Sequence, residues 1–164
     1  MRASAEPSSL GATTDASDIV PLHEGVRFRV VLLGRVFVLQ WFASPRPEDI
    51  DQICELALDA RARLGRRLIE LVYVPKGVSL GLDEIRATER MVERFPAFVV
   101  HFEKLFMVLE TESFAFDTLR RVVDMVARTA KTPFRIGQRL DVLADVAGHE
   151  AVDVAALERC LRAR

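Results

Sequence analysis

Two pairs of polar residues have the types and spacing that acid–base chemistry or ligand binding could use. His101 and Glu103 lie two residues apart in a predicted strand and so share a face, where a histidine beside a glutamate can act as an acid–base pair. Glu110 and Glu112 share a face at the end of the same stretch, where parallel sheets often place binding groups. Strand alternation produces such pairs constantly, and no third group stands at a matching spacing. We therefore expect a half-exposed sheet face here, with an enzyme around His101, Glu103 and Glu110 as an alternative.

The cysteines and histidines form no pattern that is typical of a metal site or of a disulfide framework. Cys54 and Cys160 lie more than a hundred residues apart, and neither has a partner at CxxC spacing. The three histidines are scattered along the chain. We expect buried or unreactive thiols, no bound metal and no cofactor, and a reducing compartment such as the cytoplasm.

Length and composition predict one folded domain. Of the 164 residues 50% are hydrophobic, which is enough for one buried core, and 29% are charged. Lys and Arg number 23 against 24 Asp and Glu, and a net charge of −1 argues against a protein built to bind nucleic acid or an anionic membrane. Residues 1–24 are rich in Ala, Ser, Thr, Gly and Pro and predict a flexible tail. No stretch is apolar enough for a signal peptide or a transmembrane helix, so we expect a soluble protein.

Behind these residues, strands alternate with helices. Two β-branched and aromatic stretches meet at Gly34–Arg35 and predict a hairpin. A helix then starts at Pro47, a buried strand spans Leu68–Val74, and a second helix follows and ends at Pro96. Residues 97–112 predict one long or two abutting strands, and the rest of the chain predicts in turn a helix over 114–131, a strand over 134–137, a short helix and a last helix capped by Asp153. This order predicts an α/β fold with a mostly parallel sheet of four to five strands, an antiparallel edge strand from the N-terminal hairpin, and amphipathic helices packed on it.

The order of elements resembles that of the sulphate transporter and anti-sigma factor antagonist (STAS) family of bacteria. In that family, a central strand leads into the second helix through an Asp, several apolar residues and then Asp-Ser-x-Gly-Leu. The matching stretch here begins at Glu70 and ends with Ser79-Leu80-Gly81-Leu82, with Glu70 in place of the first Asp and Val78 in place of the second. The resemblance implies a STAS-like domain over residues 25–147, followed by a C-terminal helix over residues 148–164.

What the resemblance implies for function is a non-enzymatic regulatory module that works by contact with a protein partner or by self-association. In the family, phosphate on a serine or threonine at the start of the second helix controls that contact, which makes Ser79 the phosphorylation candidate here. A helix N-terminus tolerates the charge of a phosphate, although Ser79 also suits a plain loop residue or helix cap. The predicted contact surface is the loop and second helix, together with two aromatic residues before the third helix: Leu80, Gly81, Leu82, Ile85, Arg86, Phe114 and Phe116.

An alternative from another class is a module that binds a small ligand or a lipid in a pocket between sheet and helices. Aromatic residues are dense from Phe95 to Phe116, and core packing accounts for most of them. A pocket lined by Phe98, Phe102 and Met107 would favour ligand binding, whereas a fully packed core would not.

Overall fold

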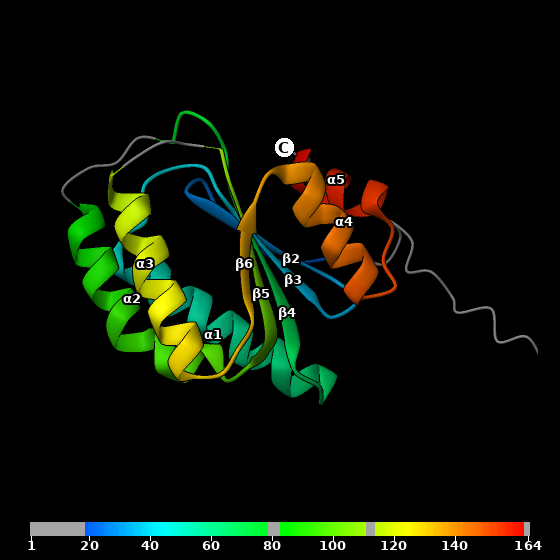
Figure 1. The fold of residues 1–164 in the computed structure, drawn as a ribbon, viewed down its shortest axis with the longest axis horizontal. Helices are drawn as coiled ribbons and strands as arrows, with labels where there is room; N and C mark the ends of the chain where they lie inside the picture. Colours follow the sequence, from blue (N-terminus) through cyan, green and yellow to red (C-terminus); the bar gives the residue numbers. More distant parts are fainter. Residues whose placement is uncertain (1–18, 79–82, 111–113, 163–164) are drawn as a thin grey trace, which may run out of the picture.

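A mixed six-stranded sheet runs through the middle of the molecule, with helices on both of its faces (Figure 1). The computed structural model describes residues 19–78, 83–110 and 114–162. In chain order the elements are β1 (Ile19–Glu24), β2 (Phe28–Leu33), β3 (Val36–Trp41), α1 (Pro47–Leu64), β4 (Leu68–Val74), α2 (Asp83–Val99), β5 (Phe102–Leu109), α3 (Phe114–Thr129), β6 (Phe134–Gly137), α4 (Arg139–His149) and α5 (Val154–Arg162). The predicted α/β class is confirmed.

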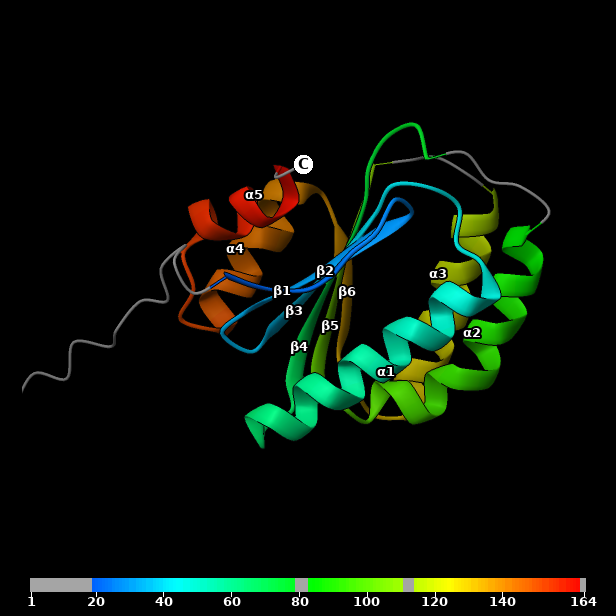
Figure 2. The same ribbon diagram turned by 180° about the vertical axis from the view of Figure 1, so that it is seen from behind.

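The strands lie in the sheet in the order in which they occur in the chain. β1, β2 and β3 are antiparallel neighbours, and β3 to β6 run parallel. Gly34 makes the tight turn between β2 and β3 with a φ of 59°, which glycine adopts without steric cost. The helices α1, α2 and α3 connect successive parallel strands from β3 to β6. Because such connections have the same handedness and each leads to the next strand in the same direction, the three helices lie on one face of the sheet, while α4 and α5 cover the other (Figures 1 and 2).

Local signals in the sequence account for α1. Pro47 occupies the first turn, and the carboxylate of Asp49 accepts a hydrogen bond from the backbone N–H of Arg46 at 2.8 Å. Gly65 ends the helix in the left-handed conformation, at a φ of 63°. The residues buried against the sheet recur at helical spacing: Ile50, Ile53, Ala57 and Ala60.

Strand β4 separates two hydrophobic cores. All seven of its residues are buried, which confirms the central strand expected from the sequence. Even-numbered residues from Leu68 to Val74 face α1, α2 and α3, and odd-numbered residues from Ile69 to Tyr73 pack toward α4 and α5. Glu70 is the one charged residue of this strand, and it belongs to the face covered by α1, α2 and α3.

The predicted antiparallel hairpin at the N-terminal side of the sheet is confirmed as β2 and β3, whereas the number of four to five strands and the place of the hairpin at the edge were wrong. The predicted tail over residues 1–24 extends too far, because Ile19–Glu24 form β1 and cover β2, so the sheet has six strands. β1 is an exposed edge strand with Pro21 in it and a register shift between Pro21 and His23. Backbone pairing holds most of this strand, and only Ile19 and Leu22 pack against the cores, so it leaves no clear alternation in the sequence.

Pro96 does not end the second helix, contrary to the prediction. α2 continues to Val99 with Pro96 inside it, and β5 starts only at Phe102. The turn that contains the proline carries Phe95, Phe98 and Val99 into the core, where each is at most 3% exposed. Burial of these side chains outweighs the backbone hydrogen bond that a proline removes.

The C-terminal helix is not a separate unit beyond the domain. Four residues of α5 belong to the core beneath the sheet: Ala156, Leu157, Cys160 and Leu161. α5 therefore packs on the chain's own sheet beside α4 (Figure 2). Within the described ranges, no helix combines the length and the apolar character needed to span a bilayer.

Candidate functional site

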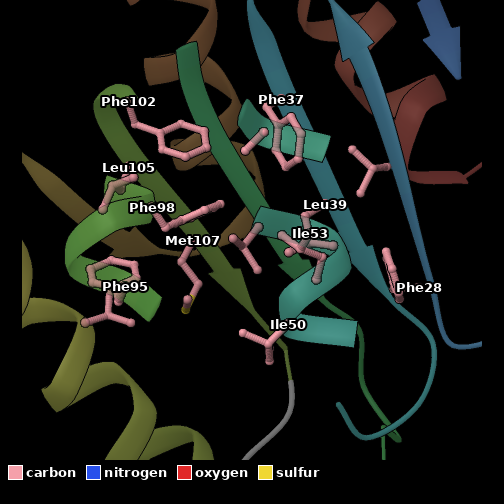
Figure 3. Packing of buried hydrophobic residues seen from close by; sticks show 14 of the residues in the cluster. Phe28, Phe37, Leu39, Ile50, Ile53, Phe95, Phe98, Phe102, Leu105 and Met107 are labelled. Carbon is pink, nitrogen blue, oxygen red and sulfur yellow. The ribbon is translucent and has the colours of Figure 1, made fainter. Parts of the chain in front are cut away.

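A cavity lies between the sheet and the three helices on one of its faces. Its lining includes Trp41, Glu70 and Met107 from the sheet, Ile53 from α1, Phe98 from α2 and Val123 from α3. We call it the central cavity. About 50 Å³ of it can hold the centre of a water molecule, and the whole hollow measures about 750 Å³ when the part open to solvent is counted. In Figure 3, Ile53 from α1 and Phe98 from α2 point toward Met107 of the sheet.

Glu70 is the only charged residue in the described lining of the central cavity. Its neighbours in the sheet are apolar, Phe37 on β3 and Leu105 on β5, and the residue is 6% exposed. Within the described part of the chain, its carboxyl group has no hydrogen bond or ion pair. Burial alone raises the pKa of its carboxyl group to about 8, so Glu70 holds its proton at neutral pH.

Cys54 contributes a second acid to the wall. Cys54 lies on α1 and is partly buried, and this burial raises the pKa of its thiol to about 11. A thiol with this pKa is protonated at neutral pH and is a poor nucleophile. The arrangement is therefore suited to holding an apolar molecule beside one ionisable group.

A more open hollow adjoins the central cavity between α1 and α2. The two hollows share Cys54 and Phe98, and the second also reaches Arg94 and His101. About 130 Å³ of the second can hold the centre of a water molecule. Beside it, Asp51 on α1 pairs with Arg90 and Arg94 on α2, each at 2.9 Å. These ion pairs join the two helices that wall the central cavity.

Most of the predicted contact surface cannot be placed. Ser79, the phosphorylation candidate, and its neighbours Leu80, Gly81 and Leu82 lie outside the described residues. Ile85 and Arg86 lie in the first turn of α2 and are exposed, Ile85 at 63%. The backbones of Phe114 and Phe116 open α3, but their side chains also fall outside the description.

The residues considered for acid–base chemistry do not meet in one cleft. His101 lies in the turn before β5, in the hollow between α1 and α2, and burial together with Arg61 lowers its pKa. Glu103 is bound instead by Arg35 at 2.5 Å and by His149 of α4 at 3.2 Å.

Glu110 lies at the opposite end of β5 from Glu103, about 23 Å away along the strand, and accepts a hydrogen bond of 2.8 Å from the hydroxyl of Tyr73. Glu112 lies outside the described residues. In the ranges that the structure covers, no three His, Cys, Asp or Glu side chains are grouped as a metal would require.

The pocket considered in the ligand-binding alternative is present, with one change in its lining. Phe98 and Met107 line the central cavity, whereas Phe102 is fully buried in the core beside Phe98, with ring centroids 4.6 Å apart. Sequence reasoning did not select Glu70 as a site residue. The available signal was one charge in a strand that is otherwise apolar and covered on both faces.

The chain has no significant match to a protein-family model, to a curated protein or to a solved structure. Function is therefore inferred from the central cavity and from the exposed surface of α2.

Proposed function

We propose that this protein is a binding module that takes a small, mostly apolar ligand into the central cavity. The observation that carries the proposal is a hollow in the hydrophobic core with a lone carboxyl group, Glu70, in its lining. Protein interiors are close-packed, and a buried polar group without a hydrogen bond lowers stability. A cavity that combines both defects is understandable if a ligand fills the space and supplies the missing polar contact.

Binding rather than catalysis is proposed because the groups in the lining are poorly suited to attack a substrate. The Glu70 carboxyl and the Cys54 thiol both have raised pKa values and hold their protons at neutral pH. A nucleophile needs a base within hydrogen-bond distance, and no described residue of the lining forms such a pair with Cys54.

The only tryptophan of the chain makes the proposal testable without a label. Trp41 is 5% exposed and lines the central cavity, so its emission should respond to occupancy. Benzene, 1-hexanol and n-hexylamine serve as small apolar probes, titrated against the full chain. We expect a saturable change of Trp41 emission with at least one of them.

A variant that fills the cavity controls this measurement. Ala87 on α2 is 1% exposed and lines the cavity, so Ala87→Leu should occupy the space and abolish the response. Ala62 is exposed on α1, and Ala62→Leu adds the same atoms in solvent and should bind like the wild type. Failure of every probe to bind the wild type, or equal binding by Ala87→Leu, would refute the proposal.

As a second candidate, we propose a STAS-like regulatory domain of the bacterial cytoplasm that contacts a protein partner or a second copy through α2. Two features favour it: the alternation of strands and helices, and the exposure of two large aliphatic side chains seven residues apart on α2, Ile85 at 63% and Val92 at 41%. Arg86 stands beside them and is also exposed.

Self-association and partner capture test this second candidate. Light scattering after gel filtration gives the mass of the wild type, of Ile85→Ser and of Ser79→Glu, and the same three proteins serve as baits for cross-linking. A dimer or a specific partner should be lost with Ile85→Ser. Leu140→Ser, which changes a 71% exposed residue of α4, is the control. Identical behaviour of wild type and Ile85→Ser would exclude this surface.

A further inference from the structure

We infer that the ligand of the central cavity is a lipophilic cation: an apolar molecule with one protonated amine, which binds beside the carboxylate of Glu70. This inference rests on the proposed function and specifies the chemistry of its ligand. It is carried by the position of Glu70 in the lining, by its lack of a partner among the described residues, and by the aromatic side chains around it.

The charge of the cavity lining favours a cationic ligand. Glu70 brings one acidic group into an apolar cavity, and the described lining contains no lysine, arginine or histidine. Of the elements packed around it, α1 adds only the neutral thiol of Cys54, α2 adds the uncharged Thr88, and α3 adds Val123. A carboxylate ligand would find no cation in the described lining, and Arg94 of the adjoining hollow already pairs with Asp51, whereas an ammonium group would find a carboxylate that lacks a partner among the described residues.

Aromatic rings around the cavity also favour a cation. The cavity is bounded by Trp41 from β3, Phe95 and Phe98 from α2, and Phe134 from β6. The faces of aromatic rings carry partial negative charge and attract cations, tryptophan most strongly. Aromatic rings around a carboxylate therefore favour a cationic nitrogen with an apolar body over a neutral molecule of the same size.

The proton that Glu70 holds links the binding of a cation to pH. Binding of an ammonium group requires the carboxylate form, so the cation should displace the proton of Glu70 into solvent. Since the pKa of Glu70 is about 8, roughly one proton is released per ligand at pH 7, and affinity for the cation rises about tenfold per pH unit from pH 6 toward pH 8. Neither an alcohol nor a carboxylate of the same length has this linkage.

Three probes with the same chain but different head groups test the inference: n-hexylamine, 1-hexanol and hexanoate, each titrated at pH 7.5 and read by Trp41 emission. We expect the amine to bind at least about tenfold more tightly than the alcohol, and hexanoate to bind most weakly. Glu70→Gln should remove the advantage of the amine and leave the alcohol unchanged. Glu89→Gln makes the same exchange at an exposed position of α2 and is the control.

A measurement on the wild type alone covers the case in which Glu70→Gln does not fold. Calorimetric titration of n-hexylamine in two buffers with different ionisation enthalpies should give about one proton released per ligand at pH 7. Equal affinity for amine and alcohol, tighter binding of hexanoate, or no proton release would overturn the inference while leaving the proposed function intact. No binding of any of the three probes would count against the proposed function itself.

Discussion

Replacing Glu70 by glutamine should change how the stability of the protein depends on pH. The carboxyl group has a pKa of about 8 in the folded protein, against its ordinary value of 4.5, and the cause is burial. An acid whose pKa is raised by folding keeps its proton more firmly in the folded state. Its contribution to stability is therefore complete below pH 4.5 and is lost as the pH rises toward about 8.

The size of the effect follows from the difference between the two pKa values. Each unit corresponds to about 1.4 kcal/mol, so the free energy of unfolding should fall by about 3.5 kcal/mol between pH 5 and pH 8 on account of Glu70 alone. Domains of this size are stable by only about 5–15 kcal/mol, so the change is easily measured. Glutamine does not ionise, and Glu70→Gln should lose this component.

Urea unfolding at pH 5, 6, 7 and 8, followed by Trp41 emission and by circular dichroism, gives the free energy of unfolding of wild type and variant. The quantity of interest is the difference between the two proteins, because it removes the contributions of groups that both share, and Glu89→Gln reports the effect of removing an exposed charge. We expect the free energy of unfolding of Glu70→Gln to increase relative to that of the wild type as the pH rises. Parallel curves for the two proteins would show that Glu70 is ionised or partnered, and the reasoning about its burial would be refuted.

Two substitutions and one labelling experiment test separate parts of the structure. Arg35→Ala removes ion pairs to Glu103 at 2.5 Å and to Glu150 at 2.6 Å, and should lower the free energy of unfolding by about 2 kcal/mol in urea; no loss would mean that these pairs are fully compensated by water. Gly65→Ala places a side chain at a φ of 63° and should cost about 1 kcal/mol by the same assay, whereas a gain would contradict this cap geometry. The thiol of Cys54 has a pKa of about 11, so it should react with iodoacetamide at pH 8 far more slowly than free cysteine. Mass spectrometry of the labelled peptide gives the rate. A rate equal to that of free cysteine would contradict the burial of Cys54.

The sequence predicts those parts of the fold whose causes are local. Pro47 predicts the start of α1, and in the structure it lies in the first turn together with Glu48 and Asp49, while Gly65 ends the helix. β4 was predicted as a central strand because its residues are apolar apart from Glu70, and it is buried throughout. In both cases the residues that carry the signal also make the contacts that decide the structure.

The errors fall where contacts distant in the sequence decide the structure. β1 pairs with β2 through its backbone, and its side chains are partly or fully exposed, so no alternation of apolar residues marks it. Pro96 predicts the end of a helix by its own chemistry, but Phe98 and Val99 pack in the core and hold one more turn. The effect of a proline on a helix can be read from the sequence, whereas the packing of Phe98 and Val99 in the core, which outweighs that effect, cannot.

The candidate site was only partly predictable for a related reason. In the ligand-binding alternative, Phe98, Phe102 and Met107 would line a pocket. Phe98 and Met107 line the central cavity, whereas Phe102 is buried in the core. The cavity itself is the space that α1, α2 and α3 leave above the sheet. That space depends on the relative position of three helices, which hydrophobic periodicity does not give.

The two faces of the sheet treat buried polar residues differently, and this contrast argues for a role of Glu70. On the face covered by α4 and α5, Arg29 and Gln40 are also buried, at 9% and 7% exposure, but they donate hydrogen bonds to the backbone carbonyls of Cys160 and Leu161. Those carbonyls belong to the last turn of α5, where the helix itself supplies no donors. The fold therefore gives each of these two side chains of the sheet a hydrogen bond, although the Oε1 atom of Gln40 has no partner among the described residues. Glu70 receives no such partner from the described residues and stands beside an open cavity, so its missing contact is best supplied by a molecule that enters that cavity.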